Sequence, residues 1–248
     1  PEGARDFLIP SRLHDGKYYA LPQAPQQFKQ LLMVGGVPRY YQIAACFRDE
    51  DPRADRLYGE FYQLDCEMSF VDDGETVRNT MDPLILDLCQ NFGHKKLVNT
   101  YKSADKDYST DPTAIPRIPF AESMERYGTD KPDLRYEMEL VELTDALKDT
   151  QFGVFKNAEC VKAICVKGGA DLTRSQIDHF TELAKKEGAG GLAYLTYKDG
   201  EIKSPIAKFL SDDELKSITE RTGATDGDIV FFGADKRQLV NKVLGKLR

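Results

Sequence analysis

The chain has 248 residues, 41% hydrophobic and 30% charged, which is a globular rather than a disordered composition. No apolar run approaches the roughly 20 residues of a membrane span, and the first residues lack a signal peptide's apolar stretch. A net charge of −7 leaves no overall basic footprint for nucleic acid, so any RNA contact has to be local. The five cysteines form no C-x-x-C pair, which argues against a disulfide framework or a metal site and favours a reducing, cytoplasmic setting.

The first 70 residues are predicted to form antiparallel strands around one helix. Asp15-Gly16 lies between two apolar runs, which is a hairpin signal. Pro25 suits the first turn of a helix and Gly35-Gly36 suits its end. Two longer strands are expected over 39–48 and 60–71, joined by a charged loop, and a helix over 75–92 with a kink or a break at Pro83.

From about residue 137 the pattern changes to alternating helices and strands, after a short helix expected over 121–127. Thr173 with Gln176, and Ser211 with Glu214, have the spacing of capping boxes, so each pair should open a helix. The strands are predicted at 161–166, 192–197 and 229–232, and the helices at 174–187, 212–222 and 235–247.

The densest group of chemically useful side chains lies where the two long strands face each other. Residues two apart on a strand share a face, so Arg48 should point the same way as Glu50. Phe61, Gln63, Asp65 and, beyond them, Glu67 should share a face for the same reason. Such a surface suits a ligand with a phosphate, an ammonium group and a planar base. The alternative is a charged hairpin whose ion pairs are solvated and weak.

Several long stretches resemble class II aminoacyl-tRNA synthetases in their bacterial aspartyl form. FRDEDPRADR and GEFYQLDCEMSF, residues 47–56 and 59–70, resemble motif 2. PEGARDFLIPSR, residues 1–12, resembles the mobile loop over the amino-acid pocket, and LPQAPQQFKQLLMVGG, residues 21–36, resembles the aspartate-binding helix. Residues 115–135 resemble the segment before the bacterial insertion, and 166–171, 188–195 and 204–210 resemble the inserted GAD domain. Ala24 departs from the pattern, because this position is often a serine in the family.

The resemblance implies an α+β fold. Residues 1–136 should form part of the class II antiparallel sheet with flanking helices, and residues 137–248 an α/β GAD insertion domain that folds on its own. Counterparts of motif 1, motif 3 and the anticodon-binding barrel are not apparent, and the sequence does not start with Met. We therefore expect a piece of a longer protein, inactive alone, whose parent is a homodimer.

The implied reaction activates L-aspartate with ATP and then transfers it to the 3′ end of tRNA(Asp). Mg²⁺ should assist, held mainly by residues outside this chain. By resemblance Arg48 is the catalytic residue that bridges the aspartate carboxylate and the α-phosphate, and a guanidinium suits this because it offers a planar fork of donors. The implied ATP contacts are Arg48, Asp49, Glu50 and Phe61, with Phe61 stacked on adenine. The implied aspartate contacts are Glu2, Gln26, Gln27, Phe28, Lys29, Arg48 and Asp65.

Arg53 and Arg56, in the loop between the strands, are candidates for contact with the tRNA acceptor end. Two other readings stay open from the sequence. One is a tRNA-binding module, since GAD-type domains also occur in tRNA-dependent amidotransferases. The other is a synthetase-like paralogue without aminoacylation activity. Whether the parent also charges tRNA(Asn) is not predicted.

Overall fold

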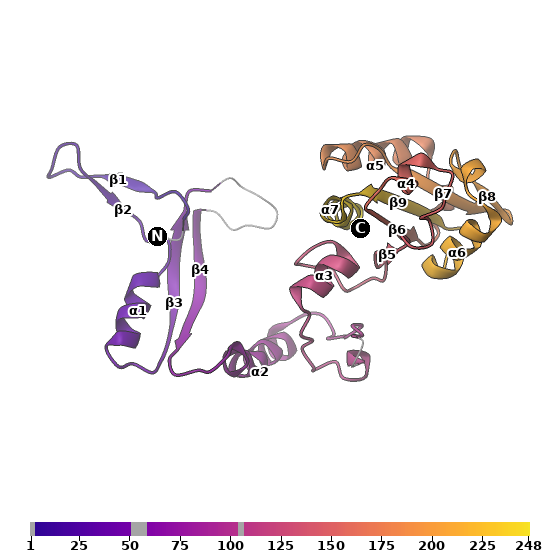
Figure 1. Cartoon of the computed structure of the whole chain (residues 1–248). Helices are drawn as coiled ribbons and strands as arrows, with labels where there is room; N and C mark the ends of the chain where they lie inside the picture. The colour runs from indigo at the N-terminus through magenta and orange to yellow at the C-terminus, as the bar shows by residue number, and fades with distance from the viewer. Residues whose placement is uncertain (1–2, 51–58, 104–106) are drawn as a thin grey trace. The chain divides into compact units, whose positions relative to one another are not determined.

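The computed structural model describes residues 3–50, 59–103 and 107–248. The chain divides into two compact units, with the boundary between Leu97 and Val98 (Figure 1). The N-terminal unit holds the candidate site, and the C-terminal unit holds the larger apolar core.

Two antiparallel hairpins and two helices build the N-terminal unit. Its elements are β1 (Leu8–Pro10), β2 (Tyr18–Ala20), α1 (Gln26–Val34), β3 (Arg39–Arg48), β4 (Gly59–Met68) and α2 (Gly74–Phe92). β1 pairs with β2, β3 pairs with β4, and α1 packs against the second pair (Figure 1). The Asp15-Gly16 turn signal is confirmed, as are the helix end at Gly35 and the strand over 39–48.

Two local predictions in this unit need correction. β4 ends at Met68 rather than continuing to residue 71. Phe70 adopts a positive φ of 56°, a conformation that a bulky residue rarely takes and that is incompatible with an extended strand. The helix α2 continues through Pro83, so of the two outcomes expected there the break is wrong, because the proline removes only one backbone donor from a helix of 19 residues.

The C-terminal unit is a five-stranded sheet in the order β5-β6-β9-β7-β8, with every neighbouring pair antiparallel. Its strands are β5 (Val141–Glu142), β6 (Cys160–Val166), β7 (Ala193–Lys198), β8 (Glu201–Lys203) and β9 (Ile229–Asp235). Its helices are α3 (Phe120–Tyr127), α4 (Gly153–Lys156), α5 (Arg174–Lys186), α6 (Asp212–Thr222) and α7 (Arg237–Leu247), with short 3₁₀ turns at Tyr108–Thr110, Gly169–Asp171 and Ala207–Phe209.

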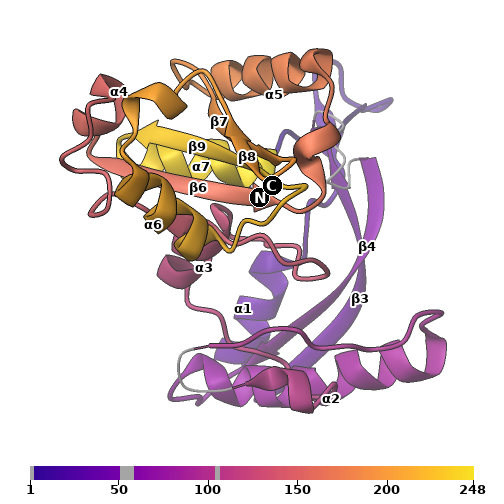
Figure 2. The ribbon, with the colours of Figure 1, turned by 90° about the vertical axis from the view of Figure 1, so that its right-hand side faces the viewer.

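Apolar side chains alternate between the two faces of this sheet, and each face has its own core. One core joins Val161, Ala163, Val230 and Phe232 to Ile218 of α6. The other joins Cys160 and Ile164 of β6 and Ile229 and Phe231 of β9 to Ile177 of α5 and to Val240 and Leu244 of α7. Figures 1 and 2 accordingly show α5 and α6 on opposite sides of the strands. Both predicted capping boxes are present, at Thr173 and at Ser211.

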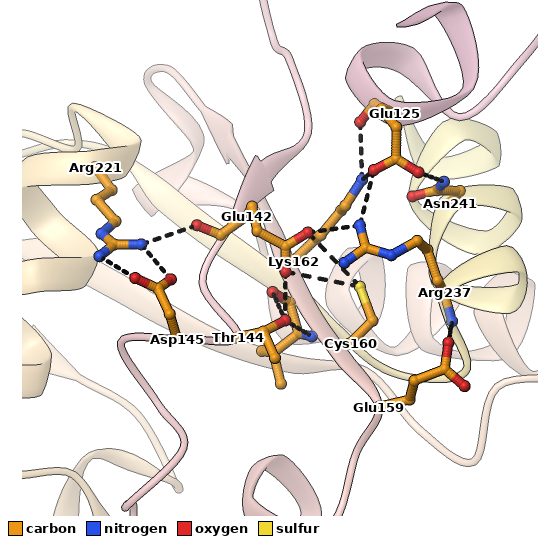
Figure 3. Close-up of polar contacts among 11 residues, drawn as sticks. Glu125, Glu142, Thr144, Asp145, Glu159, Cys160, Lys162, Arg221, Arg237 and Asn241 are labelled. Carbon is orange, nitrogen blue, oxygen red and sulfur yellow. Dashed lines mark hydrogen bonds and ion pairs between the residues drawn. The ribbon is translucent and has the colours of Figure 1, made fainter. Parts of the chain in front are cut away.

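A charged cluster attaches α3 to the sheet and to α7 (Figure 3). Lys162 is 1% exposed, and its Nζ donates to the backbone oxygen of Glu125 at 2.9 Å and to Glu125 Oε2 at 2.6 Å. Arg237 Nη1 also donates to Glu125 Oε2, at 2.8 Å, and to Glu142 Oε2, at 2.7 Å. Asn241 Nδ2 donates to the other Glu125 oxygen at 3.2 Å.

Two glycines bring the end of α3 against α7. Gly128 ends α3 with φ +70°, and a Cβ there would lie 2.1 Å from the backbone oxygen of Asn241. A Cβ at Gly245 would lie 2.5 Å from the backbone oxygen of Gly128. Only glycine at both positions allows this backbone approach. The segment before residue 137 thus packs within the C-terminal unit, and the independent folding of 137–248 stays a prediction.

Among the residues described, no helix is both long and apolar enough to cross a membrane.

Candidate functional site

The register of β3 and β4 places the predicted site residues on one face of the hairpin. Cys46 lies opposite Phe61, Gln42 opposite Asp65, and Arg48 opposite Gly59. Directly opposed residues of an antiparallel pair share a face, and so do residues two apart on one strand. Arg48, Phe61 and Asp65 therefore point to the same side, as the sequence predicts.

Arg48 is held at the end of β3 by an aromatic ring and a backbone oxygen. Its guanidinium carbon lies 5.1 Å from the centre of the Phe61 ring, a cation–π distance. Its Nε donates to the backbone oxygen of Gln23 at 3.4 Å. With Nε used in this way, the forked terminal nitrogens are the part of the guanidinium best placed for a ligand.

A second charged group lies further along the same face, between α1 and β4. Lys29 is 7% exposed, and its Nζ lies 3.0 Å from Asp65 Oδ1 and 2.8 Å from Glu67 Oε1. Burial lowers the pKa of Lys29, but the hydrogen bonds to Glu67 and Asp65 outweigh it, so the pKa is raised and the ammonium is kept. Among the described residues, Asp65 Oδ2 is buried without a hydrogen-bond partner. A buried charged oxygen of this kind is costly unless something binds it.

The segment before β1 is tied to β3 at the Arg48 end. Arg5 forms an antiparallel bridge with Asp49, whose backbone N donates to the Arg5 oxygen at 3.1 Å. Gln23 is 4% exposed, and its Nε2 donates to the Ala4 oxygen at 2.8 Å and to Asp6 Oδ1. The stretch that resembles the mobile loop is therefore connected to the strand that carries Arg48.

The other predicted site residues have different surroundings. On α1, Gln26 is half-buried, whereas Gln27 is exposed and Phe28 is 71% exposed, so neither of these two joins the Lys29 group. Asp49 is exposed and Glu50 is half-buried at the end of β3. Glu2, Arg53 and Arg56 lie outside the described residues.

Sequence reasoning missed two participants. Glu67 was placed on the site face without a role, yet it is the second carboxylate on Lys29. Gln23 was not singled out at all, because a neutral amide before a helix carries no local signal. Their partners are distant in the sequence: Gln23 bonds to Asp6, and Glu67 pairs with Lys29.

Comparison with known proteins gives the class to which this chain belongs. A family model described as tRNA synthetases class II (D, K and N) matches residues 1–232. The chain belongs to this family. The match spans both units, so the chain is more than an isolated insertion-type module.

Three similar relatives share one printed name. The chain is 49% identical over its whole length to the aspartate–tRNA(Asp/Asn) ligase of Rickettsia felis and to that of Rickettsia canadensis. It is 47% identical to the protein of the same name from Pelodictyon phaeoclathratiforme. The chain spans 40% of the length of each of these relatives.

Proposed function

We propose that this chain carries the motif 2 half of an aspartate–tRNA ligase active site. The observation that carries the proposal is the shared face of the β3–β4 hairpin, with Arg48 against Phe61 at one end and Lys29 against Asp65 further along. The first pair suits a nucleoside phosphate, and the second suits an amino acid that has a carboxylate in its side chain. Membership of the class II family supports the same reaction class.

The aspartate subsite follows from the hydrogen bonds that Lys29 and Asp65 leave open. An ammonium has three donors, and two of those on Lys29 point to Asp65 Oδ1 and Glu67 Oε1. The third is available for the side-chain carboxylate of the substrate. Asp65 Oδ2 is the buried oxygen without a described partner, and it would accept from the substrate's α-ammonium group.

The charge of this subsite sets a limit on what it does alone. One ammonium faces two carboxylates, so the group carries a net charge of −1 and cannot by itself neutralise the side chain of aspartate. A further cation from outside the described residues is required to separate aspartate from asparagine, because the two differ chiefly in charge and hydrogen bonding.

Arg48 acts on the reacting groups. An oxygen of the aspartate α-carboxylate attacks the α-phosphorus of ATP, a new P–O bond forms, and the bond to pyrophosphate breaks. The guanidinium fork would bridge the carboxylate and the α-phosphate and stabilise the charge that develops between them. The Phe61 ring, already against Arg48, would stack on adenine.

The proposed reaction uses ATP, which is accompanied by Mg²⁺. In the described part of the chain, no three His, Cys, Asp or Glu side chains are grouped so as to hold a metal ion. By resemblance to the family, the Mg²⁺ that accompanies ATP would take its protein ligands mainly from residues outside this chain. The proposed partners of the full-length protein are L-aspartate, ATP and tRNA(Asp), with Arg53 and Arg56 proposed at the acceptor end and a homodimer as the assembly.

The test is aspartate-dependent exchange of pyrophosphate into ATP by a full-length protein that contains this chain. Arg48→Lys keeps the charge and loses the fork, so we expect the exchange rate to fall about 10²- to 10³-fold. Arg39→Lys is the matched control, because Arg39 lies exposed at the other end of the same strand. Equal rates in the two variants would refute the proposed role of Arg48. Charging of tRNA(Asp) and tRNA(Asn) transcripts then gives the tRNA range, since the relatives are named for both.

A further inference from the structure

Gln23 links two parts of the candidate site that are far apart in the sequence. It lies between β2 and α1, and its side chain and its backbone face different partners. The side-chain amide holds Ala4 and Asp6 of the segment before β1. Its backbone oxygen accepts from Arg48 Nε at 3.4 Å.

The chemistry of the partners fixes the orientation of the Gln23 amide. The Ala4 carbonyl and the Asp6 carboxylate are both acceptors, so only the NH₂ group can face them. An NH₂ group has two hydrogens, one for each acceptor. Gln23 is 4% exposed, so losing either hydrogen bond leaves a polar group away from water.

The backbone on either side of Gln23 is tied to the same two parts. The Pro22 oxygen accepts from the backbone N of Phe47, the residue before Arg48, at 2.9 Å. The backbone N of Leu21 donates to the Phe7 oxygen at 3.0 Å. A shift of the segment 4–7 would therefore pull on the same short stretch of backbone that sets the direction of the Arg48 guanidinium.

We infer that Gln23 is a positioning residue that couples the segment before β1, residues 4–7, to Arg48. When the segment is in place, the amide holds the Gln23 backbone where its oxygen accepts from Nε, and the terminal nitrogens of Arg48 are turned toward the substrate. This inference rests on the proposed function for its catalytic consequence, although the tether itself does not.

The first experiment tests the tether without any activity. Gln23→Glu replaces the donor by a carboxylate that faces Asp6, so the segment should be released. In the 248-residue chain we expect trypsin to cleave after Arg5 at least several-fold faster, relative to cleavage after Arg12 in the same molecule. Asp6→Ala is the second variant, a change at an exposed side chain, and it is compared with a synthetic peptide of residues 1–16 that carries the same change, because residue 6 adjoins the Arg5 bond that trypsin cuts. It should shift the same ratio in the same direction, and an unchanged ratio in both variants would overturn the tether.

The second experiment tests the coupling to Arg48 in a full-length protein that contains this chain. Gln23→Glu should lower kcat for pyrophosphate exchange roughly tenfold, the scale of one lost hydrogen bond, and should raise KM for aspartate. Adding Asp6→Asn restores a donor opposite the new carboxylate and should recover part of the loss. In an Arg48→Lys background, where no Nε exists, Gln23→Glu should have little further effect on kcat.

Additive effects in that background, or no recovery with Asp6→Asn, would overturn the coupling. The failure of the proposed function looks different. A wild-type protein without aspartate-dependent exchange would refute the proposed function, while the trypsin ratio would still decide whether Gln23 holds the segment.

Discussion

In each unit of the molecule, one of the described lysines is buried against carboxylates, and the two groups differ in charge. Lys29 in the N-terminal unit faces Asp65 and Glu67, so the group carries a net charge of −1. In the C-terminal unit, Lys162 and Arg237 face Glu125 and Glu142, so that group is neutral. Both lysines are under a tenth exposed, so burial alone does not distinguish them.

The hydrogen bonds that the carboxylates accept distinguish a ligand site from a structural cluster. Both oxygens of Glu125 accept hydrogen bonds from protein groups, and those from Lys162 and Asn241 outweigh burial and lower the pKa of this carboxyl. Asp65, in contrast, has a buried oxygen without a described partner. The other such atom among the described residues, Asn241 Oδ1, belongs to a neutral amide. A charged oxygen left open indicates a place for a ligand, whereas a neutral cluster whose charged groups all have partners indicates a structural role.

Removing a carboxylate from the neutral cluster should give the largest effect. Glu125→Leu leaves Lys162 buried without a side-chain partner, so we expect the free energy of unfolding to fall by about 3 kcal/mol. Urea denaturation of the chain, followed by circular dichroism, measures it. The control Asp178→Asn breaks an exposed pair with Arg174 and should cost no more than about 0.5 kcal/mol. Equal stability of both variants would contradict a structural role for the cluster.

The open oxygen of Asp65 should matter for the substrate rather than for the fold. Asp65→Asn retains an acceptor for Lys29 but loses the charge that would bind the α-ammonium group. We expect kcat/KM for aspartate in pyrophosphate exchange to fall about 10- to 100-fold, the scale of a charge-assisted hydrogen bond. The melting temperature should change little. A variant with normal exchange and a lowered melting temperature would make the Lys29 group structural, and the comparison would then fail.

Low pH should destabilise the C-terminal unit by protonating a second carboxylate whose oxygens accept hydrogen bonds from protein groups. Burial raises the pKa of Asp228, but hydrogen bonds from Thr225, Lys167 and Gly168 outweigh it and lower the pKa to about 2. Because the folded pKa lies below the usual 3.8, the stabilisation is present above about pH 4 and is lost as pH falls toward 2. Its size is about 2 kcal/mol.

Urea denaturation of wild type and Asp228→Asn at steps from pH 5 to pH 2 checks this prediction. The difference in unfolding free energy between the two should shrink as pH falls. A constant difference would mean that Asp228 stabilises the unit by shape and neutral hydrogen bonds rather than by its charge.

The parts of the fold that sequence could predict are those set by near neighbours. The capping boxes at Thr173 and Ser211 involve residues three apart, and both are present. The β3–β4 face follows from alternation along two strands that are consecutive in the chain, and the register confirms it. The roles of the site residues stay predictions.

What could not be predicted depends on contacts between distant residues. Lys162 sits in the middle of an apolar strand, and nothing near it in the sequence indicates that its partner is Glu125, 37 residues earlier. The same holds for Gln23, because its hydrogen bonds join it to Asp6 and Arg48, which are both distant from it in the sequence. Phe70 was missed for a different reason, since its left-handed backbone breaks a local preference.

The backbone contact between Gly128 and Gly245 has a consequence for exchanging parts between related proteins. A chimera that takes residues 137–248 from a relative and keeps α3 from this chain combines two surfaces that meet without any side chain between them. An alanine at either position would force α3 away from α7 and would separate Glu125 from Lys162. Such a chimera therefore has to keep glycine at both positions, and its safest junction lies before Val98 rather than at residue 137.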